Sequence, residues 1–239
     1  MSKLIDKLLR KKKNICGVVI VAAGSATRMK GIDKILHPLG GMPLIVHSVA
    51  AFQMHESVKE IVIVTRTELI EEIRRLCVAY GYTKVVAVTE GGASRPESVM
   101  RGLDSLSKDV LIAAVHDGAR PFVSQRIIDE TVEKALDYHA AAPAVPVKDT
   151  IKVVENHIVK ETPNRAKLYA VQTPQIFDFD LLRGALSKAL QDGVSVTDDC
   201  SAVEAIGMSV YLCEGSDENI KITTPTDLIL ANAIWEGRL

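Results

Sequence analysis

The chain has 239 residues, of which 47% are hydrophobic and 25% charged, and its formal net charge is −1. This composition excludes a disordered chain, and a general nucleic-acid binder would show a basic excess that is missing here. The length allows one large domain or two small ones, with a core that needs no metal or disulfide to hold it together.

The cysteines and the hydropathy pattern indicate a soluble cytoplasmic protein. Cys16, Cys77, Cys200 and Cys213 show no metal-ligand spacing, and the chain opens with no secretory signal. We therefore expect reduced thiols. No apolar run approaches the ~20 residues that cross a bilayer, so we expect no stable membrane insertion.

Residues 1–14 form a basic segment with six basic side chains and one acidic side chain. Leucine and isoleucine recur in it at helical spacing. This pattern fits a short solvated helix, or a contact with a membrane surface or a polyanion. The remaining residues, 15–239, are predicted to form a single domain.

From residue 15 onward, short β-rich runs alternate with amphipathic segments. Strands are expected at 15–22, 60–65, 84–88, 110–115 and 141–147, and helices at 43–54, 68–80, 96–106 and 124–139. Strands that alternate with crossover helices form parallel sheets. The pattern therefore predicts an α/β fold with a doubly wound, mostly parallel sheet.

The alternation stops between residues 148 and 170. Residues 150–154 and 157–160 are typical of a β-hairpin with a turn near Glu155-Asn156. This hairpin arm, about residues 148–170, has no place in the parallel sheet and would leave its edges unpaired, so we expect it to pack on something, such as another subunit. A helix at 179–191, a strand at 208–213 and a helix at 225–236 complete the chain.

Ligands of open parallel sheets bind beyond the carboxyl ends of the strands. The loop after the first strand offers small residues, Ala22, Ala23 and Gly24, followed by the cations Arg28 and Lys34. It matches neither a P-loop nor a dinucleotide fingerprint. Backbone N–H groups flanked by Arg and Lys suit a triphosphate, although a tight turn with solvated charges would have the same sequence.

Three later loops carry further candidates. Gly92 and Ser98 follow the third strand, Asp117 and Arg120 follow the fourth, and Lys221 precedes the last helix. An Asp at a strand end near an Arg suits a Mg²⁺–phosphate site, where one carboxylate suffices beside phosphate oxygens. The structural alternatives are a helix cap, an Asp–Arg pair that only fixes its loop, and an ordinary surface lysine.

Seven motifs in this order resemble one family across almost the whole chain. They are AAGxxxRM (22–29), GGxxRxxSV (91–99), HDGARP (116–121), PVKDTIK (146–152), QTPQ (172–175), TDD (197–199) and NIKIT (219–223). The set is similar to the 2-C-methyl-D-erythritol 4-phosphate cytidylyltransferase family of the non-mevalonate isoprenoid pathway. The resemblance implies a Rossmann-like nucleotidyltransferase fold. It also implies a homodimeric, Mg²⁺-dependent transferase that joins CTP to methylerythritol phosphate and releases pyrophosphate.

The resemblance also assigns roles to individual residues of this chain. The catalytic charges fall on Arg28, Lys34 and Lys221. The nucleotide contacts fall on Ala22, Ala23, Gly24, Gly92, Ser98 and Asp117, of which Asp117 is also the metal-linked acid. The acceptor contacts fall on Asp117, Arg120, Thr150, Arg165, Thr197, Lys221 and Thr223, with the arm that carries Arg165 exchanged across a two-fold dimer.

This chain departs from the family pattern at three positions. The family usually has Pro-Lys-Gln around Lys34, where this chain has Asp33 and Ile35, and it often has Asp where this chain has Ala93. The Ala93 departure leaves base recognition to the backbone at Gly92.

Three alternative functions remain open on the sequence. They are a cytidylyltransferase for another polyol phosphate such as ribitol 5-phosphate, a nucleotidyltransferase for another base, and a catalytically silent nucleotide-binding module. The presence of Lys34, Lys221 and Asp117 together argues against the catalytically silent module.

Overall fold

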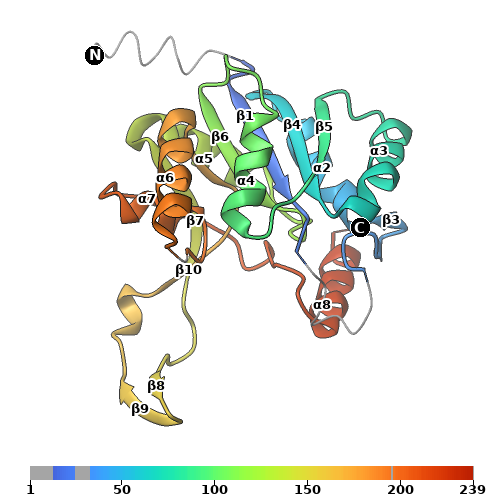
Figure 1. Cartoon of the computed structure of the whole chain (residues 1–239). Coiled ribbons are helices and arrows are strands. Elements are labelled where there is room, and N and C mark those ends of the chain that lie inside the picture. Colours follow the sequence, from blue (N-terminus) through green and yellow to red (C-terminus); the bar gives the residue numbers. More distant parts are fainter. Residues whose placement is uncertain (1–12, 25–32, 195, 239) are drawn as a thin grey trace.

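Strand β1 (Cys16–Val21) lies inside an eight-stranded sheet in the computed structural model, which describes residues 13–24, 33–194 and 196–238 (Figure 1). It pairs in parallel with β4 (Val58–Thr65) and β6 (Ile112–Asp117), and β5 (Val85–Glu90) extends the sheet beyond β4. The apolar runs of β1, β4 and β6 are buried on both faces, as parallel strands require. The predicted α/β fold with a mostly parallel sheet is confirmed.

Beyond β6 the sheet departs from the purely parallel pattern. β11 (Gln175–Asp178) lies between β6 and β7 (Ala140–Pro146) and runs antiparallel to both. β10 (Tyr169–Val171) is also antiparallel to β7, whereas β12 (Tyr211–Glu214) is parallel to it. The sequence does not indicate β10 and β11, because both are short, neither alternates, and β11 merges into the helix that follows.

Helices cover both faces of the sheet, as a doubly wound fold requires. One face carries α2 (Leu44–Gln53), α3 (Ile70–Ala79) and α5 (Gln125–Tyr138), and the other carries α4 (Arg95–Asp104), α6 (Phe179–Asp192) and α7 (Asp199–Ala205). Side chains of β1 alternate between the two layers: Val18 and Ile20 pack with the first set of helices, and Val19 with the second. Helix α7 escapes prediction because seven residues are too few to show a helical period.

A third apolar cluster joins α8 (Pro225–Glu236) to the main body. It combines Leu39 and Leu44 with Ile222 and Leu228, which connects the small hairpin of β2 (Pro38–Leu39) and β3 (Met42–Pro43) to the C-terminal helix. The Trp235 ring stands edge-on to the buried imidazole of His47, with ring centroids 4.7 Å apart. This packing fixes α8 and therefore the loop at 219–223 that leads into it.

Gly40 is the closest point of the contact between the β2–β3 turn and α8. It has φ +57°, and a Cβ added there would overlap the Trp235 indole. Gly40→Ala is therefore expected to lower the free energy of unfolding by about 2 kcal/mol and to shift the emission of Trp235, which is the chain's one tryptophan. Gly41→Ala is the matched control, because Gly41 has φ +82° but nothing within 4 Å of an added Cβ. Equal emission spectra for the two variants would contradict the contact.

The predicted β-hairpin within residues 148–170 is confirmed, but its first strand is shorter than predicted. β8 (Val153–Glu155) and β9 (Ile158–Glu161) form their own two-stranded sheet, which projects from the body (Figure 1). Asn156 and His157 have φ +51° and +64°, as a two-residue type I′ turn needs. The hairpin and the residues that lead into it expose five large aliphatic side chains: Ile151, Val153, Val154, Ile158 and Val159.

Two expectations from composition can be compared with the described residues. The four cysteines are free and buried, as expected of reduced thiols. Within the described ranges, no helix has the length and apolar character to span a bilayer. Most of the predicted basic segment, residues 1–12, lies outside the described residues.

Candidate active site

A pocket at the carboxyl ends of β1 and β6 gathers five of the predicted residues. It has about 380 Å³ of empty space, which includes some open solvent, and is lined by Val21, Ala22, Gly24, Lys34, Ile35, Arg95, Asp117, Ala119 and Lys221. A wider, mostly apolar hollow between α3 and β5 contains none of the predicted residues. Because the carboxyl edge of a parallel sheet is where ligands bind, we place the candidate site at the β1–β6 pocket.

Asp117 is the central anion of this pocket. It is the last residue of β6 rather than a loop residue, so the sheet fixes its backbone. Its Oδ1 accepts a hydrogen bond from Arg95 Nη1 at 2.9 Å, and its Oδ2 lies 2.9 Å from Lys221 Nζ and 3.4 Å from Arg120 Nε. Burial raises the pKa of this carboxyl, but the charges of Arg95, Lys221 and Arg120 outweigh burial and hold the pKa well below its usual range. Asp117 is therefore ionised at neutral pH.

The loop that carries Lys221 is hydrogen-bonded to the segment that precedes β11. Asn219 Nδ2 donates to Gln172 Oε1 at 3.1 Å and to the Thr173 carbonyl at 3.0 Å. Thr173 Oγ1 in turn accepts from the Asp117 N–H at 3.1 Å. The QTPQ and NIKIT motifs are thus bonded to each other beneath Asp117, and this connection orients Lys221 toward the carboxylate.

His116 precedes Asp117 but belongs to the core. Its side chain is fully buried, its Nε2 lies 3.1 Å from the Arg120 carbonyl, and its ring stands against Phe52. Burial lowers the pKa of the imidazole to about 4. A neutral, packed imidazole has a structural role here.

The two departures beside Lys34 both support its position. Asp33 Oδ1 accepts from the Ile35 N–H at 3.0 Å, and the other Asp33 oxygen pairs with Arg66. The Ile35 side chain is only 2% exposed and belongs to the core. Lys34 is therefore held between a polar anchor on one side and an apolar anchor on the other.

The glycine pair brings the β5–α4 loop against the first loop. A Cβ at Gly91 would overlap Ala23, so the close approach of the two loops requires glycine there. The Gly92 N–H donates to Ser98 Oγ at 3.0 Å, and Ser98 is buried in the first turn of α4. Ser98 thus holds the loop whose backbone faces the first loop.

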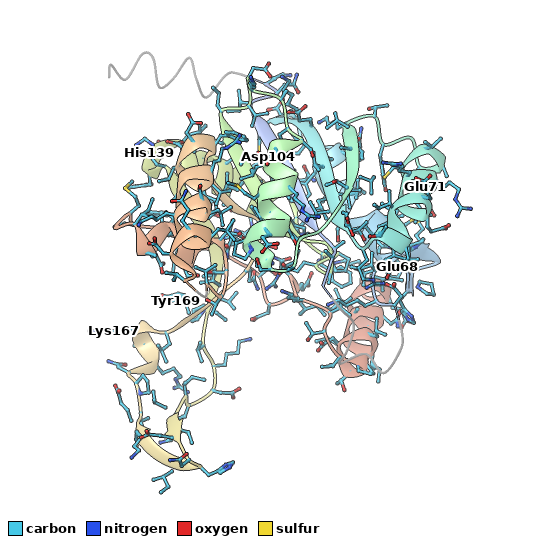
Figure 2. All side chains as sticks on the ribbon, in the orientation of Figure 1. Glu68, Glu71, Asp104, His139, Lys167 and Tyr169 are labelled. Carbon is cyan, nitrogen blue, oxygen red and sulfur yellow. The ribbon has the colours of Figure 1, made fainter. Side chains whose placement is uncertain are left out.

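Several predicted residues do not line the pocket. Thr150 and Arg165 are exposed and lie on the stretch between β7 and β10 that includes the arm, where Arg165 Nη1 donates to the Lys148 carbonyl at 2.8 Å. Figure 2 shows Lys167, two residues further on, apart from the sheet. Thr197 precedes α7, and Thr223 precedes α8. Arg28 lies outside the described residues.

Arg95 and Asp199 lie in the motifs at 91–99 and 197–199 but have no predicted role. Arg95 is the first residue of α4, and its guanidinium contacts Asp117 and the fully buried Asp199. A signal existed in the sequence: a cation in the first turn of a helix opposes the helix dipole, so it needs nearby anions to hold it.

Comparison with known proteins identifies the relatives of this chain. The family model of 2-C-methyl-D-erythritol 4-phosphate cytidylyltransferase (IspD) matches residues 16–237. Curated proteins of that name are 46% identical in Halalkalibacterium halodurans, over 91% of this chain and 95% of that protein, and 44% identical in Caldanaerobacter subterraneus, over 89% and 95%.

Solved structures with similar names share the fold. The 4-diphosphocytidyl-2C-methyl-D-erythritol synthase of Anaerococcus prevotii superposes with a TM-score of 0.83 at 30% identity, covering 93% of this chain and 99% of that one. The 2-C-methyl-D-erythritol 4-phosphate cytidylyltransferase of Thermus thermophilus gives a TM-score of 0.76 at 32% identity with the same coverage. Both similarities cover nearly the whole of this chain.

Proposed function

The chain belongs to the 2-C-methyl-D-erythritol 4-phosphate cytidylyltransferase family, and we propose that the pocket around Asp117 is its active site. The enzyme transfers the CMP moiety of CTP to 2-C-methyl-D-erythritol 4-phosphate in isoprenoid biosynthesis. The products are 4-diphosphocytidyl-2-C-methyl-D-erythritol and pyrophosphate.

The observation that carries the proposal is the meeting of Lys34, Lys221 and Asp117 in one pocket, beside the Ala22–Gly24 backbone. A phosphate oxygen of the acceptor attacks the α-phosphorus of CTP and forms a new P–O bond to it. The bond between the α-phosphorus and the pyrophosphate leaving group breaks. Both reactants are polyanions, so the reaction needs positioning and positive charge more than covalent help.

The residues divide this work by position. Lys34 and Lys221 face the pocket, where they neutralise the charge that develops around the α-phosphorus. Arg28 is expected to have the same role, because its motif resembles that of the family. No side-chain base is required, because the second pKa of a phosphate monoester is about 6 and the attacking oxygen is ionised at neutral pH.

Magnesium fits the pocket through Asp117. The carboxylate is ionised, and its Oδ2 partner Lys221 is 40% exposed, so Asp117 would hold the ion and the Lys221 ammonium would be free to pair with a phosphate. The described residues contain no group of three acidic, His or Cys side chains that would hold a metal without substrate. One carboxylate together with phosphate oxygens of the substrate would be enough to hold Mg²⁺. When bound, the ion supplies positive charge to the phosphates.

Asp117→Asn is expected to raise the Mg²⁺ concentration for half-maximal activity by at least about tenfold, because the amide lacks the negative charge that a hard cation prefers. The measurement is a Mg²⁺ titration of pyrophosphate release at saturating substrates. Asp109→Asn is the matched control, since Asp109 also pairs with a lysine but lies just before β6, at the other edge of the sheet. An unchanged titration for Asp117→Asn would show that the carboxylate only fixes its loop.

We also propose that the enzyme is a homodimer of the cytoplasm, a compartment that keeps thiols such as its four buried cysteines reduced. Arg165 and Thr150 lie outside the pocket of their own chain, on the stretch that includes the exposed apolar arm. An arm exchanged across a two-fold axis would bring them to the partner's acceptor site. Arg120, Thr197 and Thr223 complete the acceptor side from the same chain.

A further inference from the structure

We propose that Arg95 is a positioning residue of the transfer reaction, whose fork holds Asp117 and the acceptor loop at 197–199 in one fixed arrangement. In one respect the inference rests on the proposed function, namely that Thr197 lies on the acceptor side. It assigns a purpose to two residues, Arg95 and Asp199, that have no role in the mechanism above.

The guanidinium of Arg95 divides its nitrogens between two carboxylates. Nη1 donates to Asp117 Oδ1 at 2.9 Å, while Nη2 and Nε approach Asp199 Oδ2 at 2.8 and 3.3 Å. The two carboxylates are 22 and 104 positions from Arg95 in the chain. One side chain therefore connects the end of β6, the start of α4 and the start of α7.

Burial makes this connection stiff. The side chains of Asp199 and Asp117 are only 1% and 7% exposed, and that of Arg95 is 23% exposed. Burial raises the pKa of the Asp199 carboxyl, and the charge of Arg95 opposes that rise. Without Arg95, two buried carboxylates would remain near each other without the cation between them, which is costly in a low-dielectric interior.

The held loop leads directly to the acceptor side. Asp198 caps α7, and its neighbour Asp199 opens the helix, so Thr197 is only two residues from the carboxylate that Arg95 grips. Gln175 Nε2 donates to Asp198 Oδ2 at 2.7 Å, which fixes the same turn to β11. Movement of the Arg95 fork would therefore shift Thr197 relative to Asp117, and with it the acceptor phosphate relative to the triphosphate.

A lysine could not replace this fork. Its single ammonium is a point charge, whereas the planar guanidinium presents separate N–H donors in fixed directions. Arg95→Lys is thus expected to resemble Arg95→Gln in its KM for methylerythritol phosphate. If Arg95→Lys restored the wild-type KM, charge alone would be sufficient and the bridging role would be wrong.

The main test is a double-mutant cycle of Arg95→Gln and Asp199→Asn, read as kcat and KM for methylerythritol phosphate at saturating CTP and Mg²⁺. Alone, Asp199→Asn is expected to raise this KM by about tenfold, and in the Arg95→Gln background by less than about twofold. Equal effects in both backgrounds would overturn the inference, because Asp199 would then act without Arg95. Should Arg95→Gln fail to fold, Arg95→Lys takes its place in the cycle.

A second cycle provides the matched control. Arg183 and Asp104 also form an ion pair at 2.8 Å, but both are half exposed, and Asp104 is the last residue of α4, at the opposite end from Arg95 (Figure 2). Arg183→Gln and Asp104→Asn are each expected to leave the KM for methylerythritol phosphate within about twofold of the wild-type value.

Thr197→Val distinguishes failure of the proposed acceptor side from failure of the positioning role. An unchanged acceptor KM for Thr197→Val would contradict the proposed acceptor side, whereas a raised KM with an additive Arg95–Asp199 cycle would contradict the positioning role alone.

Discussion

Lys34→Ala and Lys221→Ala are each expected to lower kcat by on the order of 10²-fold, as the loss of a preorganised charge contact does. Both side chains line the pocket at the carboxyl edge, where the triphosphate would lie. The fold is expected to survive, since Asp117 keeps Arg95 and Arg120 as counter-charges when Lys221 is removed. The measurements are steady-state pyrophosphate release and the thermal unfolding midpoint.

Lys59→Ala serves as the control for these two variants. Lys59 also pairs with an aspartate, Asp109, but it lies near the amino end of β4, at the opposite edge of the sheet. We expect the kcat of Lys59→Ala to stay within about twofold of wild type, since an exposed ion pair contributes little to the stability of the fold. If Lys34→Ala and Lys221→Ala behaved like Lys59→Ala, the pocket would not be the site of transfer.

Mixing two inactive variants, Arg165→Ala and Lys34→Ala, is expected to restore about a quarter of the wild-type activity. The proposed arm exchange places Arg165 in the partner's site, where its fork would bind the acceptor phosphate. In a mixed dimer, one site would then carry both lesions and the other none. Random pairing makes half of the dimers mixed, and each mixed dimer has one intact site of two.

The variants are unfolded and refolded together, with subunit exchange verified by two affinity tags. Each variant refolded alone is the baseline. If Arg165 serves its own chain, every site in the mixture carries one lesion and no activity returns. That outcome, with exchange verified, would refute the exchanged arm.

The core of the fold could be read from hydrophobic patterning. β1, β4 and β6 each contain a continuous apolar run, and α5 and α8 begin after caps at Ser124 and Thr224, so apolar runs and end signals agree with the structure. β11 could not be read in this way. Its four residues are held between β6 and β7 by tertiary pairing, and only their neighbours in space make them a strand.

The site, too, has residues that the sequence could predict and residues that it could not. The carboxyl-edge rule is enough to bring Ala22 and Lys34, which follow β1, together with Asp117 at the end of β6. The bridge from Arg95 to Asp199 spans 104 positions of sequence, and no local pattern encodes such a contact. The supporting roles of Asp33 and Ile35 were equally hidden, because their value depends on Arg66 and on the core around Lys34.

The most direct test of the account measures pyrophosphate release by the wild-type enzyme over a panel of nucleotides and polyol phosphates. Gly91 lies close against Ala23, and we expect the backbone of the Gly91–Gly92 loop to form hydrogen bonds with the edge of cytosine and to leave no room for a purine. We expect turnover with CTP and methylerythritol phosphate, with kcat/KM at least about 100-fold higher for CTP than for ATP, GTP or UTP and a comparable preference over ribitol 5-phosphate. Comparable turnover with ATP, or with ribitol 5-phosphate as acceptor, would contradict the proposed specificity for CTP and methylerythritol phosphate.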